Sequence, residues 1–273
     1  MFTLIKIEIE DSFREILQAE LSLFAFDSFI ETDTGFETSI LSEDFQQADF
    51  EQLMQRYEAM TSLAWHIEEV EKQNWNQLWE SQYEAIVIND KCRVRADFHE
   101  ADPNFDYEIV IIPKMSFGTG HHQTTALMLN LQYESDFLGK KVADLGCGTG
   151  VLGIFALKKG AISLKACDID DWAVENTNEN AQLNAVSLEV FKGTASDFSE
   201  KNYEVVLANI NRNVLLSEME LYADLLLAKG ELYLSGFYEE DLASIRQKAQ
   251  NCGLVYQKHL QKDQWIAAKF VKA

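Results

Sequence analysis

The sequence predicts an α/β protein of two domains, in which a small α+β domain precedes a larger domain built on a mainly parallel sheet. Three observations lead to this prediction. At 273 residues the chain is long for one domain and comfortable for two. Residues 1–70 show the element order βαββαβ, whereas strands and helices alternate from residue 141 onward. A glycine-rich turn follows the first strand of that alternation.

The first 70 residues contain two strand–helix–strand units. Thr3–Ile9 alternates apolar and polar residues, which is typical of a half-buried strand. We expect a helix next, with one apolar face formed by Ile16, Leu17, Leu21 and Phe24. The later elements are strands at Phe26–Glu31 and Phe36–Leu41, a helix at Phe45–Met60 and a strand at Leu63–Val70. This order predicts a ferredoxin-like domain, a fold that hosts many functions.

Residues 71–84 connect the two predicted domains. They contain neither Gly nor Pro and are expected to form a helix. Trp75, Leu78 and Trp79 fall at i, i+3 and i+4 and make one apolar stripe. We therefore predict a semi-rigid helical linker and not a flexible one.

The second domain, residues 85–273, begins with short strands and continues as an alternating α/β pattern. The expected strands lie at 85–88, 92–96, 108–112, 142–145, 164–168, 188–191, 205–208 and 231–235. Helices are expected near 151–159, 171–183, 213–227 and 239–251. Such alternation indicates a mainly parallel sheet covered on both faces. Residues 254–259 and 264–270 have no helix between them and must pair antiparallel.

Charge and composition exclude several classes of function. The net charge of −22 argues against a surface that follows nucleic-acid phosphates, so we expect no direct nucleic-acid partner. Residues 1–70 hold 3 Lys/Arg against 16 Asp/Glu. This is either an ordinary solvated acidic surface or a module that docks onto a basic protein. The four scattered cysteines suggest neither a zinc site nor a disulfide framework, and we expect no metal.

The chain shows no signal for a membrane or for secretion. No apolar run approaches the roughly 20 residues of a spanning helix, and the charged start lacks a secretory apolar region. We therefore expect a cytoplasmic protein without a membrane partner, and a monomer.

The glycine-rich turn Asp144–Gly150 joins a buried strand to a helix. Its glycines allow a sharp turn and a close approach to a ligand. Two fingerprints fit it. One is the Asp-x-Gly-x-Gly-x-Gly form used for S-adenosylmethionine. The other is the dinucleotide Gly-x-Gly-x-x-Gly that begins at Gly148, with Asp168 twenty residues on. The motif alone does not separate the two cofactors.

Three features favour S-adenosylmethionine, and with it a methyltransferase over a nicotinamide-dependent oxidoreductase. Asp144 precedes the turn, where a carboxylate suits the cationic methionine end of that cofactor and would repel a pyrophosphate. The closing antiparallel strands are unusual for a nicotinamide domain. Ala208-Asn209-Ile210 follows the fourth strand of the alternation, where amine-methylating enzymes place an Asn or Asp beside the reacting nitrogen.

The turn and its neighbours supply the candidate site residues. Asp168 ends the second strand of the alternation, where a carboxylate can accept both ribose hydroxyls. The alternative is that Asp168 only caps the next helix. Asp170 is the better candidate for that cap. Asp197, after the third strand, is a weaker candidate for the adenine amino group. Cys147 is expected to be a small side chain in a tight space, not a nucleophile.

A second glycine block, residues 115–126, precedes the alternating sheet. It leads into an apolar helix, and we expect it to fold over the cofactor with Thr125 as a hydrogen-bonding residue. His121 and His122 invite a metal interpretation. Adjacent His side chains on a helix point about 100° apart, however, and no Cys or carboxylate completes a ligand set.

At these residues the chain resembles the ribosomal protein L-eleven methyltransferases (PrmA). The matching blocks are Phe117-Gly118-Thr119-Gly120-x-His122-x-Thr124-Thr125, the turn Asp144–Gly150, Asp168-Ile169-Asp170 and Ala208-Asn209-Ile210. The resemblance covers the whole chain, since that family also has an N-terminal ferredoxin-like substrate domain and a helical linker with an Asn-Trp pair, here Asn74-Trp75.

The resemblance implies a seven-stranded Rossmann-like methyltransferase domain that methylates lysine ε-amines and the N-terminal α-amine of one basic ribosomal protein. The cofactor contacts it implies are Thr125, Gly146, Asp168 and Asn209, to which the turn adds Asp144 and Gly148; Asn209 is the catalytic candidate. Two departures stand out: Gln123 replaces the usual Pro, and Asn211-Arg212-Asn213 follows the Asn209-Ile210 pair. Alternatives are a methyltransferase of the same fold with another substrate, and a module that binds the cofactor without turnover.

Overall fold

The computed structural model describes residues 1–26, 28–70, 83–113 and 123–273. The chain divides into two compact units, Met1–Tyr83 and Glu84–Ala273. The predicted helical linker, with its stripe of Trp75, Leu78 and Trp79, lies outside the described residues. Within the described part of the chain, no helix is both long enough and apolar enough to cross a membrane.

The first unit follows the predicted element order. Its elements are β1 (Phe2–Ile9), α1 (Asp11–Leu21), a 3-10 turn (Ser22–Phe24), β2 (Ser28–Thr32), β3 (Gly35–Leu41), α2 (Gln47–Glu58) and β4 (Leu63–Val70). The four strands pair antiparallel in the order β2-β3-β1-β4. Residues of α1, α2 and the sheet share one hydrophobic core, so both helices pack on the same sheet face. The ferredoxin-like assignment of this unit stays a prediction.

The apolar face predicted for the first helix is only half correct. Leu17 and Leu21 are fully buried, whereas Ile16 is 54% exposed and Phe24 39% exposed. The α-helix ends at Leu21, and the 3-10 turn that follows changes the rotation per residue. Phe24 therefore leaves the line of the buried stripe.

The second unit opens with a three-stranded sheet and continues as the predicted alternation. The elements are β5 (Ile86–Asn89), β6 (Cys92–Ala96), β7 (Tyr107–Ile111), α4 (Gln123–Tyr133), β8 (Lys141–Leu145), α5 (Val151–Lys158), β9 (Ser163–Asp168), α6 (Asp171–Leu183), β10 (Glu189–Lys192), a 3-10 turn (Ala195–Asp197), β11 (Tyr203–Asn209), α7 (Arg212–Leu225), β12 (Leu226–Tyr238), a 3-10 turn (Glu239–Asp241), α8 (Leu242–Asn251), β13 (Leu254–Lys262) and β14 (Trp265–Lys272).

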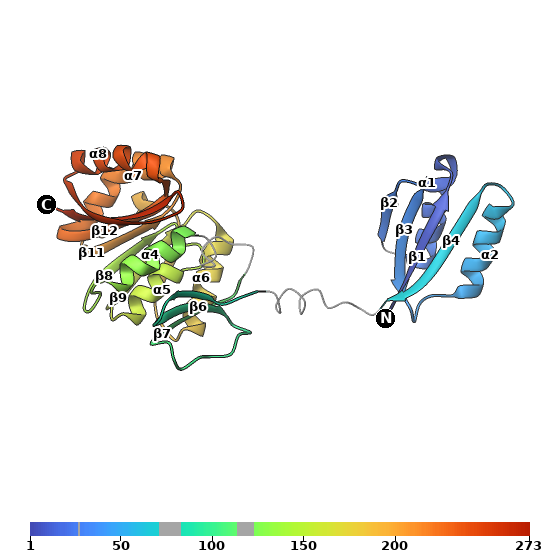
Figure 1. Cartoon of the computed structure of the whole chain (residues 1–273), viewed down its shortest axis with the longest axis horizontal. Coiled ribbons are helices and arrows are strands. Elements are labelled where there is room, and N and C mark those ends of the chain that lie inside the picture. The colour runs from blue at the N-terminus through green and yellow to red at the C-terminus, as the bar shows by residue number, and fades with distance from the viewer. Residues whose placement is uncertain (27, 71–82, 114–122) are drawn as a thin grey trace. The chain divides into compact units, whose positions relative to one another are not determined.

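The larger sheet has seven strands in the order β10-β9-β8-β11-β12-β14-β13. The first five are parallel, and β14 pairs antiparallel with β13, as expected, and also with β12. Figure 1 shows α7 and α8 on one face of this sheet and α4 and α5 on the other. Alternate residues of β8 supply the two cores: Ala143 and Leu145 face one, and Val142 the other. This is the predicted Rossmann-like arrangement.

The predicted boundary between the helix near 213–227 and the strand at 231–235 is wrong by a few residues. α7 ends at Leu225, and Leu226 is already extended, with ψ 141°. The register between β11 and β12 then shifts, from Tyr203 opposite Leu226 to Val205 opposite Glu231. Lys229 adopts a φ of 65°, so the strand begins with an irregular stretch at Leu226, where the sequence predicted the last residues of the helix.

Candidate functional site

The predicted site residues gather at one edge of the parallel sheet. β8 lies between β9 and β11, and Leu145 pairs with both Cys167 and Ala208. The residues that follow these three, Gly146, Asp168 and Asn209, therefore leave neighbouring strands at the same end. The chain runs from β8 to β9 on one side, while β11 lies on the other. Ligands of parallel α/β sheets bind where the strand order reverses in this way.

The glycine turn requires backbone that other residues rarely adopt. Gly146, Gly148 and Gly150 have φ values of 66°, 57° and 75°. A Cβ on Gly146 would also lie 3.1 Å from the side chain of Ile210. The amides of Gly146 and Cys147 both donate to the carbonyl oxygen of Cys167, at 2.8 and 3.0 Å, which fastens the turn to β9.

Asp168 is held against this turn by both of its carboxylate oxygens. Oδ2 accepts from the amide of Gly148 at 2.9 Å, and Oδ1 accepts from the amide of Asp170 at 3.2 Å. A carboxylate has about four acceptor positions, so both oxygens can still accept hydroxyl groups. Asp170 occupies the N-cap position of α6 as predicted, although its side chain accepts no capping bond from the described residues of the helix.

Asp144 lies beneath the turn. It is 1% exposed, and its Oδ2 accepts from the amide of Gly153 at 3.0 Å. A Cβ on Gly153 would lie 2.4 Å from the end of the Leu164 side chain and 3.0 Å from Oδ2 of Asp144, so glycine gives α5 its close approach to this carboxylate. Burial raises the pKa of Asp144 to about 7, opposed by the Gly153 amide and reinforced by Asp168. The carboxylate thus supports α5, and its predicted contact with the cofactor stays a prediction.

Asn209 and Thr125 meet although they lie 84 residues apart. The side-chain nitrogen of Asn209 donates to Oγ1 of Thr125 at 3.4 Å. Thr125 is 1% exposed in the first turn of α4, and Asn209 is half-buried at the end of β11. The structure therefore brings together two residues that the sequence placed in separate blocks.

Cys147 and Asp197 are two further residues of this region for which the sequence made a prediction. Burial raises the pKa of the Cys147 thiol well above its ordinary value, which disfavours the thiolate that a nucleophile needs. Its Sγ lies 3.3 Å from Oγ1 of Thr177. Asp197 accepts from the amide of Thr194 at 2.8 Å and caps the 3-10 turn. Its proposed reach to an adenine stays a prediction.

Most of the second glycine block, including His121 and His122, lies outside the described residues. At the start of α4, Gln123 donates through Nε2 to Oδ2 of Asp263 in the turn between β13 and β14.

The segment Asn211-Arg212-Asn213, the other departure from the family pattern, also has a local role. Asn211 caps α7 by accepting from the amide of Val214 at 3.2 Å, and Arg212 pairs with Asp241 at 2.6 Å.

Sequence reasoning missed the contribution of α6. Side chains of Thr177 and Asn180 donate to carbonyl oxygens of Gly148 and Thr149 in the turn. The signal was available, because Asn176, Asn180 and Asn184 repeat every four residues and so share one helix face.

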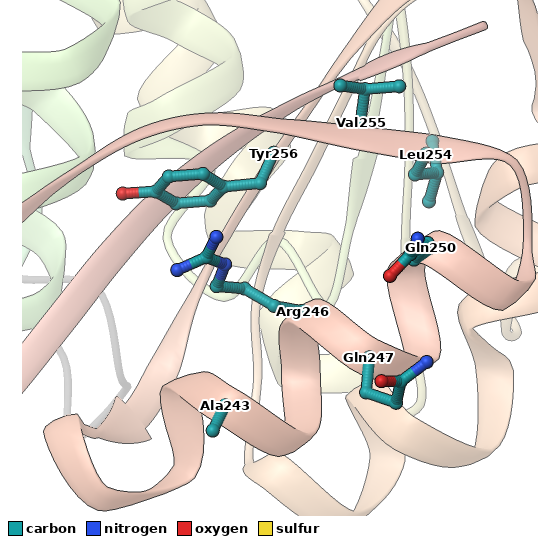
Figure 2. Close-up of a pocket in the computed structure, with 7 residues that line it drawn as sticks. All are labelled: Ala243, Arg246, Gln247, Gln250, Leu254, Val255 and Tyr256. Atoms are coloured by element: carbon teal, nitrogen blue, oxygen red, sulfur yellow. The ribbon is translucent and has the colours of Figure 1, made fainter.

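The described residues hold no metal cluster, and none of the predicted site residues lies at the pocket beside α8. Within that part of the chain, no group of three His, Cys, Asp or Glu side chains is placed to hold a metal ion. A pocket of about 490 Å³ lies between α8 and β13 (Figure 2). There the guanidinium carbon of Arg246 is 4.1 Å from the centre of the Tyr256 ring. β13 is three strand positions beyond β11, and none of the predicted site residues lines this pocket.

The chemistry of the edge fits a nucleoside with a cationic centre better than a pyrophosphate. Two carboxylates, Asp144 and Asp168, contact the turn or the helix behind it. Residues 146–150 carry no basic side chain. The carboxylate of Asp168 would repel a pyrophosphate, whereas it can accept ribose hydroxyls and its charge attracts a sulfonium.

Comparison with known proteins identifies the family. The family described as "Ribosomal protein L11 methyltransferase (PrmA)" matches residues 10–273. A ribosomal protein L11 methyltransferase of Phocaeicola vulgatus is 37% identical over 265 residues, covering 96% of this chain and 94% of the relative. One of Porphyromonas gingivalis is 40% identical over 261 residues, covering 94% and 90%.

A solved structure supports the same family assignment. The crystal structure of a ribosomal protein L11 methylase from Lactobacillus delbrueckii subsp. bulgaricus has a TM-score of 0.65 and 26% identity, and the match covers 70% of this chain and all of that one. The dinucleotide interpretation of the glycine turn is therefore set aside. The chain belongs to the ribosomal protein L11 methyltransferase (PrmA) family, and S-adenosylmethionine is its cofactor.

Proposed function

We propose that this enzyme methylates lysine ε-amino groups and the N-terminal α-amino group of ribosomal protein L11. The names of its relatives supply the substrate. The observation that carries the choice of an amine is the pair formed by Asn209 and Thr125 at the edge where the glycine turn lies. Since that substrate belongs to the ribosome, the proposal also places the enzyme in the cytoplasm.

Several residues at the sheet edge would hold the cofactor. Asp168 is positioned to accept ribose hydroxyls, and the turn at Gly146 and Gly148 lets backbone approach the ligand closely. Thr125 borders the same edge from α4, while Asp144 supports the turn from below. When bound, S-adenosylmethionine supplies a methyl group on a sulfonium, which is an electrophile that an amine attacks directly. The protein's task is then chiefly alignment.

Asn209 is the residue we assign to amine alignment. Its Nδ2 is committed to Thr125, so the side chain presents Oδ1 as the acceptor for a neutral amine. An amine that donates one hydrogen to this oxygen has a restricted lone-pair direction. Restricting that direction favours the in-line geometry that methyl transfer requires.

The amine must lose a proton before it can react. A free lysine has a pKa near 10.4, so presenting its neutral form at pH 7 costs about 4–5 kcal/mol. We assign this proton loss to water before attack and give no side chain of the protein the role of general base. The proposal therefore requires a rate that falls steeply as the pH falls below neutral.

The acidic first unit is our candidate for substrate docking. Residues 1–70 carry 3 Lys/Arg against 16 Asp/Glu, which complements a basic protein. The unit also has a pocket of about 130 Å³, whose lining includes the half-exposed Phe24 together with Asp44. An apolar side chain flanked by a lysine or arginine matches this combination.

The proposal is tested by incubating the purified full chain with labelled S-adenosylmethionine and purified L11, followed by peptide mass spectrometry. We expect label on lysine side chains and on the N-terminal amine. An Asn209→Ala enzyme that still binds S-adenosylhomocysteine is the control for adventitious labelling. Label that appears on another ribosomal protein but never on L11 would overturn the substrate assignment, and label on side chains other than amines would overturn the reaction type.

A further inference from the structure

Helix α6 and its C-cap residue Asn184 bury three asparagines on one face. Asn176 and Asn180 are fully buried and Asn184 is 7% exposed. Asparagine is a poor helix former, and a buried amide is costly unless it is hydrogen-bonded. Three such residues in register therefore indicate that their amides make bonds on which the surrounding structure depends.

All three amides bond to backbone at the edge of the three-stranded sheet, and Asn176 does so by donating to the carbonyl oxygen of Ile112 at 3.4 Å. The order β5-β6-β7 leaves β7 with one unpaired side. Asn184 accepts from the amide of Val110 at 2.9 Å and donates to its carbonyl oxygen at 2.6 Å. Asn180 accepts from the amide of Ile112 at 2.8 Å. The side chains thus satisfy the backbone groups that a further strand would pair.

Asn180 differs from Asn184 in what its nitrogen contacts. Nδ2 of Asn180 donates to the carbonyl oxygen of Thr149 at 2.9 Å. One position earlier in the turn, the carbonyl oxygen of Gly148 accepts from Oγ1 of Thr177 at 3.0 Å. Nδ2 of Asn184 donates instead to carbonyls of Val110 and Asn180, which lie outside the glycine turn.

We propose that Asn180 is a positioning residue for the cofactor: its amide ties the glycine turn to the end of β7 and holds the Thr149 carbonyl toward α6. In a trans peptide the C=O and the following N–H point in opposite directions. Holding the carbonyls of Gly148 and Thr149 on α6 therefore fixes the direction of the amides that follow them. Without this donor, the Thr149 carbonyl loses a buried hydrogen bond, and the turn can relax by rotating that peptide.

The substitution Asn180→Asp separates the acceptor role of the Asn180 side chain from its donor role. The new side chain keeps an acceptor for the Ile112 amide but loses the donor to Thr149 and the longer bond to Oδ1 of Asn176, and its charge repels the Thr149 carbonyl. Asn184→Asp is the matched control. It makes the same chemical change one helical turn later, likewise keeping the acceptor for Val110 and losing the donor, with no bond to the glycine turn.

Binding of S-adenosylhomocysteine to the full chain is the readout, measured by calorimetry at pH 8 beside the thermal unfolding midpoint. We expect both variants to unfold at lower temperature. Only Asn180→Asp should raise the Kd, by about tenfold or more, whereas Asn184→Asp should change it less than about twofold. Because no ribosomal protein enters this assay, its result is independent of the substrate proposed above.

A pH series distinguishes positioning from general damage. Protonation restores a donor to the introduced carboxyl group, so the ratio of the Asn180→Asp Kd to the wild-type Kd should fall as the pH is lowered from 8 to 5.5. The corresponding Asn184→Asp ratio should stay flat. Should Asn180→Asp not fold, Thr177→Val removes the neighbouring donor and should raise the Kd by about three- to tenfold. Equal effects of the two asparagine variants, or an unchanged Kd in both Asn180→Asp and Thr177→Val, would overturn the proposal.

Discussion

The side-chain nitrogen of Asn209 donates to the hydroxyl oxygen of Thr125 across 3.4 Å and links the end of β11 to the first turn of α4. This bond decides which end of the Asn209 amide remains available. The nitrogen is committed to an acceptor that is 1% exposed, so the oxygen is the end presented to a substrate. The bond therefore sets the polarity of the site that we assign to the reacting amine.

Removing the acceptor at Thr125 should slow the reaction more than it weakens the fold. Thr125→Val keeps the side-chain shape and loses the hydroxyl, which leaves the Asn209 amide free to turn over. A lost hydrogen bond of about 1 kcal/mol corresponds to a fall in kcat of about five- to tenfold. Steady-state kinetics with L11 measure this. Thr124→Val makes the same change one residue earlier, and an equal loss there would mean that the effect is not specific to Thr125.

Asn209→Ala should remove the alignment of the substrate amine, while the dependence of kcat/KM on pH should stay the same. We expect kcat to fall by about 100-fold, since an interaction of about 2.7 kcal/mol made in the transition state is lost. Both wild type and variant should lose kcat/KM steeply below neutral pH, because the substrate amine itself must be neutral. The measurement is kcat/KM between pH 6 and 9. A bell-shaped wild-type profile that one His substitution abolishes would contradict proton loss to water.

Asp168→Ala should weaken the cofactor specifically. The variant loses the two bonds that Asp168 accepts from Gly148 and Asp170 as well as the acceptors for a ribose. We expect the Kd of S-adenosylhomocysteine to rise by about 100-fold, as for two hydrogen bonds of about 1.4 kcal/mol each. Calorimetric titration measures it. Asp171→Ala, a mostly exposed acid three residues on that pairs with Lys192, should leave the Kd unchanged.

Asp144 should make the fold less stable as the pH rises from about 4 to about 7. Burial raises its pKa from 3.8 to about 7 in the folded chain, so the folded state binds its proton more tightly than the unfolded state does. The free energy of unfolding then decreases through this range and is constant above it. A pKa difference of about 3 corresponds to about 4 kcal/mol.

Asp144→Asn tests that relationship, because asparagine keeps an acceptor for the Gly153 amide and does not titrate. Chemical unfolding of the full chain between pH 4 and pH 8 should show the variant gaining stability relative to wild type by a few kcal/mol. Stability curves for the two proteins that stay parallel across this range would show that Asp144 is ionised throughout.

Reversing charge on the first unit should weaken substrate docking without touching the cofactor. Glu31, Asp33 and Glu43 are exposed, and their joint replacement by Lys should raise the KM for L11 by about tenfold at low salt. Added salt should reduce the difference, since exposed charges are screened within about 10 Å at 0.1 M. The Kd of S-adenosylhomocysteine serves as the control. An unchanged KM would show that this acidic surface is only a solvated one.

The sequence predicted the sheet of the second unit well because its strands are buried on both faces. Apolar runs such as Val205–Ala208 admit few alternatives once helical segments flank them. The glycine turn, Asp168 and Asn209 follow the ends of such strands, so their convergence was predictable from strand order alone. The boundary of α7 was not, because the switch to extended backbone at Leu226 depends on tertiary pairing with Tyr203.

What the sequence did not reveal is the direction of polar side chains. The sequence did not predict the bond that Oδ2 of Asp144 accepts from the amide of Gly153. The asparagines of α6 look like a solvated helix face, and only packing against β7 shows that Asn180 is buried. Residue periodicity places these asparagines on one helix face, but it does not identify the strand, distant in sequence, that covers this face.

The position of β14 has a consequence for how the protein is made. Residues 265–272 lie inside the large sheet, between β12 and β13, although they are the last to be synthesised among its strands. Until they emerge from the exit tunnel, β12 has one unpaired side and β13 has no partner in this sheet. The first unit, with its own core, can fold much earlier. We infer that in a nascent chain the acidic first unit is folded well before the seven-stranded sheet of the second unit is complete.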